Sequence, residues 1–286
     1  MERRGAGSGG GMGGLPIPMG KTGGIGGIIV LLIVLFLGGR SITGGGDGGS
    51  GYGLPEVLNG IPANQPAAQE GQPITAPTES EAFIAFVLDD VQQTWAEQFR
   101  QAGRQYQNAR LTTFSNSVST RGCGDAPSAV GPFYCPADGY VYLDESFFDE
   151  LSQRFGAPGD FAKAYVIAHE LGHHVQNLLG IDDQVREAVQ RNPGDQNDLS
   201  VRQELQADCL AGVWGHSANE RGLLEAGDVE EGLGAAEAVG DDRLTQGRAS
   251  PDSFTHGTSE QRMRWFKRGF DSGDPQDCDT FAAGDL

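Results

Sequence analysis

Two histidines and a glutamate in one short run place the strongest constraint on how this chain can fold. They stand at His169-Glu170-Leu171-Gly172-His173, the pattern HExxH. On an α-helix, residues four apart lie one turn above each other on one face, so both imidazoles can reach a single Zn²⁺ with Glu170 close beside it. Chance can produce so short a pattern, and its context therefore has to be considered.

The flanking sequence predicts that the motif lies in the middle of a helix over 160–179. Pro158 and Gly159 offer a turn, Asp160 offers a carboxylate at the amino end, and Gly180 offers a stop. Apolar residues recur at helical spacing on a stripe next to that of the histidines, namely Phe161, Tyr165, Ala168, Gly172, Val175 and Leu179. This context favours a helix that carries His169 and His173 as zinc ligands.

A catalytic zinc held by two histidines needs a third protein ligand and keeps its fourth position for water. Glu204 and Asp208 are four apart in a segment predicted to be helical from Ser200, with Ser200 and Gln203 as a capping box. Such a pair alone is most often solvated on a helix surface. The rest of this segment is apolar and should be buried, where an unpaired carboxylate costs several kcal/mol. We therefore expect Glu204 to be the third ligand and Asp208 to accept the outer N–H of one histidine.

Longer stretches of the chain resemble a known family. The pattern of HExxH followed, after about thirty residues, by ExxxD resembles the gluzincin metallopeptidases, whose best-known member is thermolysin. Stretches across nearly the whole chain resemble the bacterial putative neutral zinc metallopeptidase family: 123–124, 131–136, 168–176, 202–212, 240–243, 253–262 and 278–281. The resemblance implies a zincin-like domain with Zn²⁺ as cofactor and a peptide or protein as substrate.

The mechanism we expect is zinc-assisted amide hydrolysis. Zinc on His169, His173 and Glu204 polarises the scissile carbonyl and acidifies water, and Glu170 moves the water's proton to the leaving amine. His256, in the loop before the last predicted helix, is a candidate to stabilise the oxyanion, as a comparable histidine does in thermolysin-like enzymes. A lone histidine beside a helix cap is more often structural, so both roles stay open for His256.

A second class of function also stays open. The chain could be a membrane-tethered, zinc-containing binding or scaffold protein without proteolytic activity. Glu170 favours the enzyme, because a structural zinc site needs no general base and usually closes its fourth position with Cys or His.

Composition divides the chain into four predicted parts. Many of the 45 glycines lie in the first sixty residues, and we expect a cytoplasmic Gly-rich tail (1–22), a transmembrane helix (23–39), a Gly/Pro-rich flexible linker (40–78) and the metallopeptidase domain (79–286). The span has 17 uncharged residues, about 26 Å as a helix. Basic residues upstream of it favour a cytoplasmic amino end, and hence a single-pass protein of the bacterial inner membrane with its domain outside. A cleaved signal peptide and a buried core helix are the alternatives.

The four cysteines fit an extracytoplasmic domain. We favour disulfides between Cys123 and Cys135 and between Cys209 and Cys278, among three possible pairings, with four buried thiols as the alternative. The net charge of −19 argues against nucleic acid as a partner, because phosphate binding needs a basic surface. The sequence makes no prediction of oligomeric state.

The predicted fold class is α+β, mostly helical with a small antiparallel sheet. An amphipathic helix opens the domain, and strands are expected at 111–114, 131–135 and 140–143. Further helices are expected at 145–155, 160–179, 200–216, 228–239 and 258–270. In zinc peptidases an edge strand beside the HExxH helix commonly binds the substrate, and 140–143 is the candidate for that edge.

Overall fold

The structure, a computed structural model, describes residues 1–3, 72–73 and 77–286 and is mostly helical with a small sheet, the predicted α+β class. Its helices are α2 (Glu79–Gln101), α3 (Glu145–Gln153), α4 (Asp160–Leu179), α5 (Ile181–Arg191), α6 (Gln196–Glu220), α7 (Asp228–Ala238), α8 (Asp241–Leu244) and α9 (Ser259–Ser272). Its strands are β1 (Glu2–Arg3), β2 (Gln72–Pro73), β3 (Arg110–Phe114), β4 (Ser117–Ser119), β5 (Asp125–Pro127), β6 (Phe133–Cys135) and β7 (Tyr140–Asp144).

Three helices differ clearly from the prediction. Helices α5 and α8 were not predicted, and α6 begins at Gln196, four residues earlier than expected. The capping box at Ser200 and Gln203 is therefore wrong, because both residues lie inside the helix. The Ser200 hydroxyl instead donates to the Thr255 carbonyl at 2.9 Å.

The main sheet is mixed rather than antiparallel. The described residues form five strands in the order β2-β1-β3-β7-β6, in which β3 pairs in parallel with β1 and β7, while β6 pairs antiparallel with β7. Every residue of β7 is buried, as in a strand covered on both faces. The prediction that 140–143 forms the edge is therefore wrong: β7 is interior, and β6 is the edge strand that packs on α4.

Strands β1 and β2 join amino-terminal residues to the main sheet. Strand β1 pairs antiparallel with β2 and parallel with β3, and the Arg3 guanidinium binds the Glu81 carboxylate of α2. Residues 1–3 thus form part of the main sheet.

Within the part of the chain that the structure describes, no helix combines the length and the apolar character that a membrane span requires. The predicted span 23–39 lies outside the described residues, as does nearly all of the linker 40–78. The prediction of a single-pass inner-membrane protein with its domain on the extracytoplasmic side is therefore wrong.

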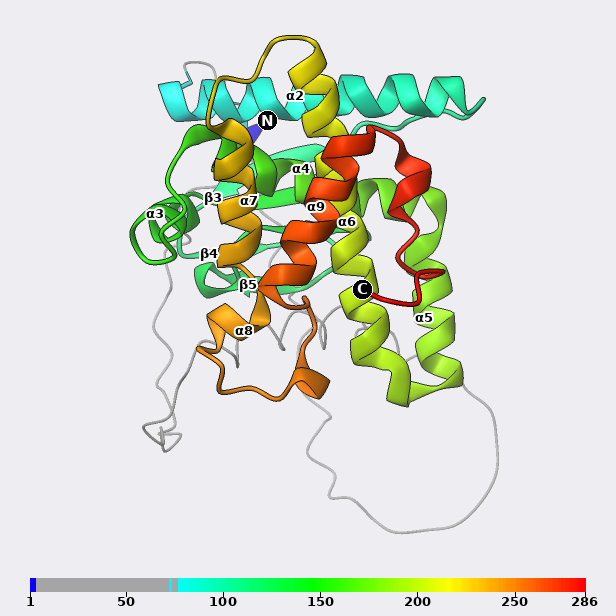
Figure 1. Cartoon of the computed structure of the whole chain (residues 1–286). Coiled ribbons are helices and arrows are strands. Elements are labelled where there is room, and N and C mark those ends of the chain that lie inside the picture. The colour runs from blue at the N-terminus through cyan, green and yellow to red at the C-terminus, as the bar shows by residue number, and fades with distance from the viewer. Residues whose placement is uncertain (4–71, 74–76) are drawn as a thin grey trace, which may run out of the picture.

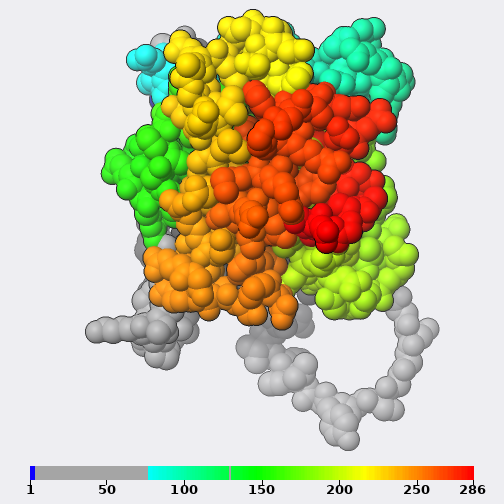
Figure 2. All heavy atoms as spheres, viewed as in Figure 1, coloured from blue at the N-terminus to red at the C-terminus, as the bar shows by residue number. Residues whose placement is uncertain are grey.

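Four helices form the layer that carries the candidate site. Helix α4 packs against α6 and α7, and α9 packs against the same two helices. Figure 1 shows α2 lying crosswise to α6, α7 and α9, with the sheet behind these helices. Figure 2 shows that α7, α9 and the carboxyl-terminal segment close over this side of the molecule. Stacking of Phe161 on Trp214 joins α4 to α6 in the core below them.

Helices α6 and α9 make their closest approach at two glycines. A methyl group on Gly212 of α6 would lie 2.1 Å from the carbonyl oxygen of Phe266, and one on Gly269 of α9 would lie 1.9 Å from that of Cys209. Both obstacles are backbone atoms, so a Cβ at either position requires the helices to separate. The two glycines therefore set how closely α9 approaches α6.

Replacing Gly269 by alanine should lower the free energy of unfolding by about 3 kcal/mol, because a clash with backbone cannot be relieved by a change of rotamer. Gly234 of α7 is the matched control, since a methyl group there meets nothing within 4 Å. Gly234→Ala should stabilise the protein by about 0.5–1 kcal/mol through helix propensity. Denaturant unfolding of both variants measures the change in the free energy of unfolding, which should be negative for Gly269→Ala and positive for Gly234→Ala. Equal changes in the two variants would contradict the close approach of α6 and α9.

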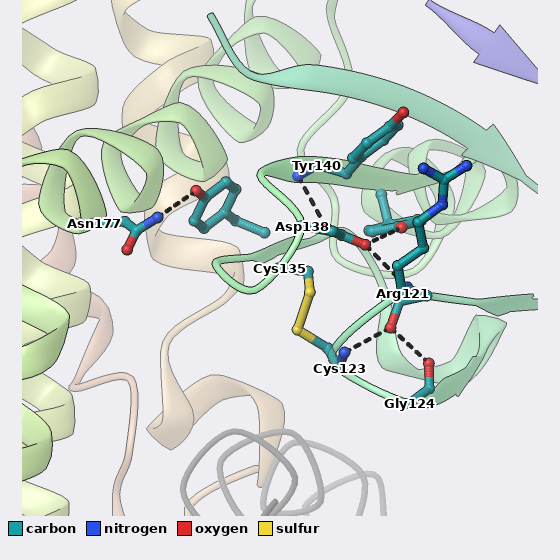
Figure 3. Close-up of a disulfide and its surroundings, with 10 residues drawn as sticks. Arg121, Cys123, Gly124, Cys135, Asp138, Tyr140 and Asn177 are labelled. Carbon is teal, nitrogen blue, oxygen red and sulfur yellow. Dashed lines mark hydrogen bonds between the residues drawn. A yellow bond between two sulfur atoms is a disulfide. The ribbon is translucent and has the colours of Figure 1, made fainter. Parts of the chain in front are cut away.

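The described residues contain two disulfides, and they join the expected pairs, Cys123 with Cys135 and Cys209 with Cys278. The sequence separations are 12 and 69 residues, so loop closure contributes about 3 and 4 kcal/mol. The Cys123–Cys135 bond ties the segment between β4 and β5 to the edge strand β6 (Figure 3). Beside it, the Asp138 carboxylate accepts the backbone N–H groups of Arg121 and Tyr140 at 3.1 Å each. The wall of the sheet next to α4 is therefore held covalently and by hydrogen bonds.

Candidate metal centre

Helix α4 presents His169 and His173 on one face, and α6 presents Glu204 opposite them. The two histidine Nε2 atoms lie 3.2 Å apart. Glu204 Oε2 lies 3.2 Å from His169 Nε2, and Glu204 Oε1 lies 3.5 Å from His173 Nε2. The spacing of the two sequence motifs therefore brings three donor groups together across the α4–α6 contact.

These separations are of the size found between ligands of one zinc ion. Bonds from zinc to nitrogen or oxygen are about 2.0–2.2 Å, which places two ligand atoms about 3.3–3.6 Å apart at the tetrahedral angle. The two Nε2 atoms lie 3.2 Å apart, and each has one oxygen of the Glu204 carboxylate within 3.5 Å, Oε2 for His169 and Oε1 for His173. Imidazole nitrogen and carboxylate oxygen are also donors that zinc prefers. The side chains present at this site thus fit a bound zinc.

Asp208 holds His169 in place from behind. Its Oδ1 lies 2.8 Å from His169 Nδ1, so the imidazole donates its outer N–H to a carboxylate and turns Nε2 toward the centre. Asp208 is fully buried, and Arg262 of α9 donates to both of its oxygens at 2.8 Å. The Tyr165 hydroxyl also donates to Asp208 Oδ1, at 2.5 Å. Helices α4, α6 and α9 thus meet at one buried ion pair behind the metal centre.

His173 is held by amides instead of a carboxylate. Its Nδ1 lies 2.8 Å from Gln176 Oε1, one turn further along α4. The Gln176 amide nitrogen donates to the Gln203 carbonyl at 2.7 Å and to Gln206 Oε1 at 3.1 Å. This chain of amides fixes the orientation of His173 and connects it to α6.

Burial and close charges shift the pKa values at the site. Burial alone would raise the pKa of Glu204, but the imidazoles of His173 and His256 outweigh it and hold this pKa well below its usual range. Burial alone would lower the pKa of His169, but Asp208 outweighs it and raises this pKa to about 9. A metal ligand has to be deprotonated, so zinc uptake displaces the proton from His169.

Glu170 lies beside the three donor groups and carries no partner of its own. Its side chain is buried, and burial raises its pKa. Among the described residues, its carboxylate takes part in no hydrogen bond. A carboxylate with a raised pKa and free oxygens is suited to accept a proton and then release it.

A cavity of about 280 Å³ opens onto these groups. Its walls come from α4, from α6, from the stretch that leads into edge strand β6, and from the loop that carries His256. Part of the cavity lining is apolar, and we call six of its side chains the apolar recess: Val130, Phe133, Phe147, Phe155, Val166 and Leu244. The cavity therefore joins an apolar recess to the donor cluster.

Asp241 holds the His256 loop against the cavity. Its Oδ2 accepts the backbone N–H groups of Thr255 and His256 at 2.7 Å and that of Gly257 at 3.2 Å. Its Oδ1 lies 3.4 Å from His256 Nδ1. His256 lines the cavity, and its charge favours the ionised form of Glu204. One buried carboxylate thus fixes both the backbone and the imidazole of this loop.

Comparison with known proteins places the chain in a family. The family model described as "Putative neutral zinc metallopeptidase" matches residues 1–281. The chain belongs to this family. It is 50% identical over 289 residues to an uncharacterized protein of Escherichia coli K12, YpfJ, covering 98% of this chain and 94% of the relative. An uncharacterized protein of Mycobacterium bovis, Mb2605, is 46% identical over 195 residues, or 63% of this chain and 65% of the relative. No solved structure matches this chain.

The residues that the sequence singled out all lie at one site of this zinc metallopeptidase family member. The groups that line the cavity are His169, Glu170, His173, Glu204 and His256. Asp208 lies directly behind His169 rather than behind His173. Their roles as ligands, proton carrier and oxyanion donor stay predictions.

Sequence analysis found Asp208 but missed three other side chains that hold the site together. Arg262 and Tyr165 bind Asp208, and Gln176 binds His173. Gln176 could have been found, because it follows His173 by three residues on one helix face. Arg262 reaches Asp208 from 54 residues away, and no local pattern indicates that contact.

Proposed function

We propose that this chain is a zinc-dependent peptidase that hydrolyses peptide bonds. The observation that carries the proposal is the close approach of the donor atoms of His169, His173 and Glu204, with Glu170 beside them in an open cavity. Zinc bound there would supply a Lewis acid that polarises the scissile carbonyl and makes water more acidic. Membership of the metallopeptidase family supports the same class of reaction.

The chain's own residues then have defined tasks. The Glu170 carboxylate accepts a proton from the attacking water and donates it to the leaving amine. His256 donates a hydrogen bond to the oxygen that gains negative charge, from a loop already fixed by Asp241. Asp208 and Gln176 keep the two ligand imidazoles from turning.

Edge strand β6 supplies a place for an extended substrate. Strand β7 pairs with one side of β6 only, so in the described sheet the other side has no partner strand. Phe133 and Tyr134 of β6 line the cavity, which puts this open edge beside the donor cluster. A peptide that pairs with β6 would carry its backbone past Glu170. Strand β6 thus takes the role that the sequence suggested for 140–143.

A zinc-containing binding or scaffold protein is the alternative. A structural zinc site usually has four protein ligands and needs no acid or base. Here the donor group in the described residues has three members, His169, His173 and Glu204. A cavity opens onto them, and an unengaged carboxylate lies next to them. These features favour the peptidase.

Metal analysis and cleavage profiling together test the proposal. The purified protein should contain one zinc per chain and cut members of a peptide library. A chelator should stop the cleavage, and added zinc should restore it. One zinc with no peptide cut would favour the scaffold protein, and a protein with no affinity for zinc would contradict both functions.

A further inference from the structure

Helix α5 places a buried carboxylate in the wall of the same cavity. The chain leaves α4 through Gly180, whose φ of 77° suits glycine, and α5 begins at once with Ile181. Asp182 therefore lies in the first turn of α5, where only 5% of its surface is exposed to solvent. It lines the cavity together with the metal-site residues.

Five carboxylates line the cavity, and Asp182 is the buried one to which neither the proposed mechanism nor the local structure assigns a role. Glu204 belongs to the metal centre and Glu170 to proton transfer. Asp144 caps α3 by accepting from the Ser146 backbone at 3.0 Å. Glu150 is exposed, with Arg154 at 3.7 Å. Among the carboxylates of the described cavity residues, Asp182 is thus the one that is neither part of the metal centre, nor a helix cap, nor the proton carrier, nor close to an arginine partner.

The surroundings of Asp182 do not balance its charge. Its Oδ1 accepts one hydrogen bond, from the Gln203 amide at 2.7 Å, while its Oδ2 has no partner among the described residues. The nearest cation along the helix, Arg186, forms its ion pair with Asp183 instead. Burial and the Asp183 charge raise the pKa of Asp182 to about 7. A buried carboxylate in such a state is stabilised by any cation that enters beside it.

Asp182 and Val166, one of the apolar recess residues, lie toward opposite ends of α4. Val166, in the recess, precedes His169 by three residues, while Asp182 follows the last residue of α4, Leu179. At 1.5 Å per residue, about 20 Å of helix separate Val166 from Leu179, with the metal centre between them. A peptide bound along the cavity can therefore place one side chain in the recess and another at Asp182.

We propose that Asp182 is a specificity-determining residue that binds a lysine or arginine side chain of the substrate. This inference rests on the proposed peptidase function and adds the chemistry of one subsite to it. The cationic side chain enters the cavity from the α5 end and binds the free Oδ2 of Asp182, while Gln203 holds the carboxylate in position through Oδ1. The apolar recess takes a hydrophobic side chain on the other side of the metal centre.

A binding experiment tests this subsite without relying on catalysis. The zinc-loaded Glu170→Gln protein is titrated with short peptides in which one lysine, moved along an alanine and leucine background, is compared with acetyl-lysine at the same position. At one position lysine should bind about 10- to 50-fold more tightly, as expected for a charged hydrogen bond in a buried site. No lysine preference at any position would overturn the proposal.

Two further variants assign the preference to Asp182. In the same background, Asp182→Asn keeps the shape of the side chain and should reduce the preference to less than about threefold. Asp183→Asn is the matched control, because its carboxylate is mostly exposed and paired with Arg186; it should keep the preference. A lysine preference that survives Asp182→Asn would show that another group binds the cation and would overturn the proposal.

Cleavage by the protein with Glu170 intact separates this inference from the proposed function. A library should be cut mainly where lysine or arginine occupies one fixed position relative to the cut bond. Cleavage without such a preference would overturn the Asp182 subsite and leave the peptidase standing. Lysine-selective binding with no cleavage of any peptide would overturn the peptidase and support the subsite.

Discussion

Peptide cleavage should fall by roughly 10²- to 10⁴-fold in kcat/KM when Glu170 is replaced by glutamine, with the zinc content unchanged. The amide of glutamine fills the same space but cannot accept a proton from water. His169, His173 and Glu204, the three groups that converge on the metal position, are all retained in this variant. Steady-state kinetics on a cleaved library peptide, with metal analysis of the same sample, measure both quantities.

Glu150→Gln is the matched control for this experiment. Glu150 lines the same cavity but is exposed on α3 near Arg154. Removing its charge should leave kcat within about twofold, since surface charges of this kind contribute little. If Glu170→Gln kept full cleavage, Glu170 would not be the proton carrier. If it lost zinc as well as cleavage, the experiment would point to an effect on the metal centre instead.

Replacing Arg262 by methionine should lower the free energy of unfolding by about 3–5 kcal/mol, because Asp208 then stays buried without a cation. Arg262 is buried and donates to both Asp208 oxygens. Denaturant unfolding at pH 7 measures this loss. Arg264→Met on the same helix is the control, since Arg264 is exposed and its removal should change the stability by less than about 0.5 kcal/mol.

The loss caused by Arg262→Met should depend on pH in a defined direction. Burial alone would raise the pKa of Asp208, but Arg262 outweighs it and lowers this pKa in the folded protein. The ion pair therefore stabilises the fold above the unfolded pKa of about 3.9, and this contribution is lost as the pH falls through the folded pKa. The difference between the two proteins should shrink when unfolding is measured below about pH 4. A difference that is constant with pH would contradict this account of Arg262.

Helical spacing was sufficient to predict the centre of the site. A period of 3.6 residues places His169 with His173 and Glu204 with Asp208, and the apolar stripe shows which way α4 faces. The contacts that hold these groups come from other parts of the chain, as Arg262 does from α9. Such contacts depend on how helices pack, and a single sequence carries no local pattern for them.

The missed elements have similar causes. Helix α5 follows directly on Gly180 and buries only Asp182 and Val185, which leaves too weak a periodicity to predict it. Strand β7 was taken for an edge because its sequence is strand-like, yet strand order depends on partners far along the chain. The apolar run 23–39 has the composition of a membrane span. The pairing of β1 with β2 joins residues far apart in sequence, and no local pattern predicts it.

The Cys209–Cys278 bond closes residues 209–278, about a quarter of the chain, into a covalent ring. This ring contains α7, α8, the His256 loop and α9 with Arg262. Its stretch 246–253, between α8 and α9, is largely exposed and therefore open to proteolytic attack. If the protein is a peptidase, it can cleave itself when it is concentrated during purification. Autoproteolysis within 246–253 would leave the two fragments joined by the disulfide, so the protein would migrate as one band on a denaturing gel until a reductant is added.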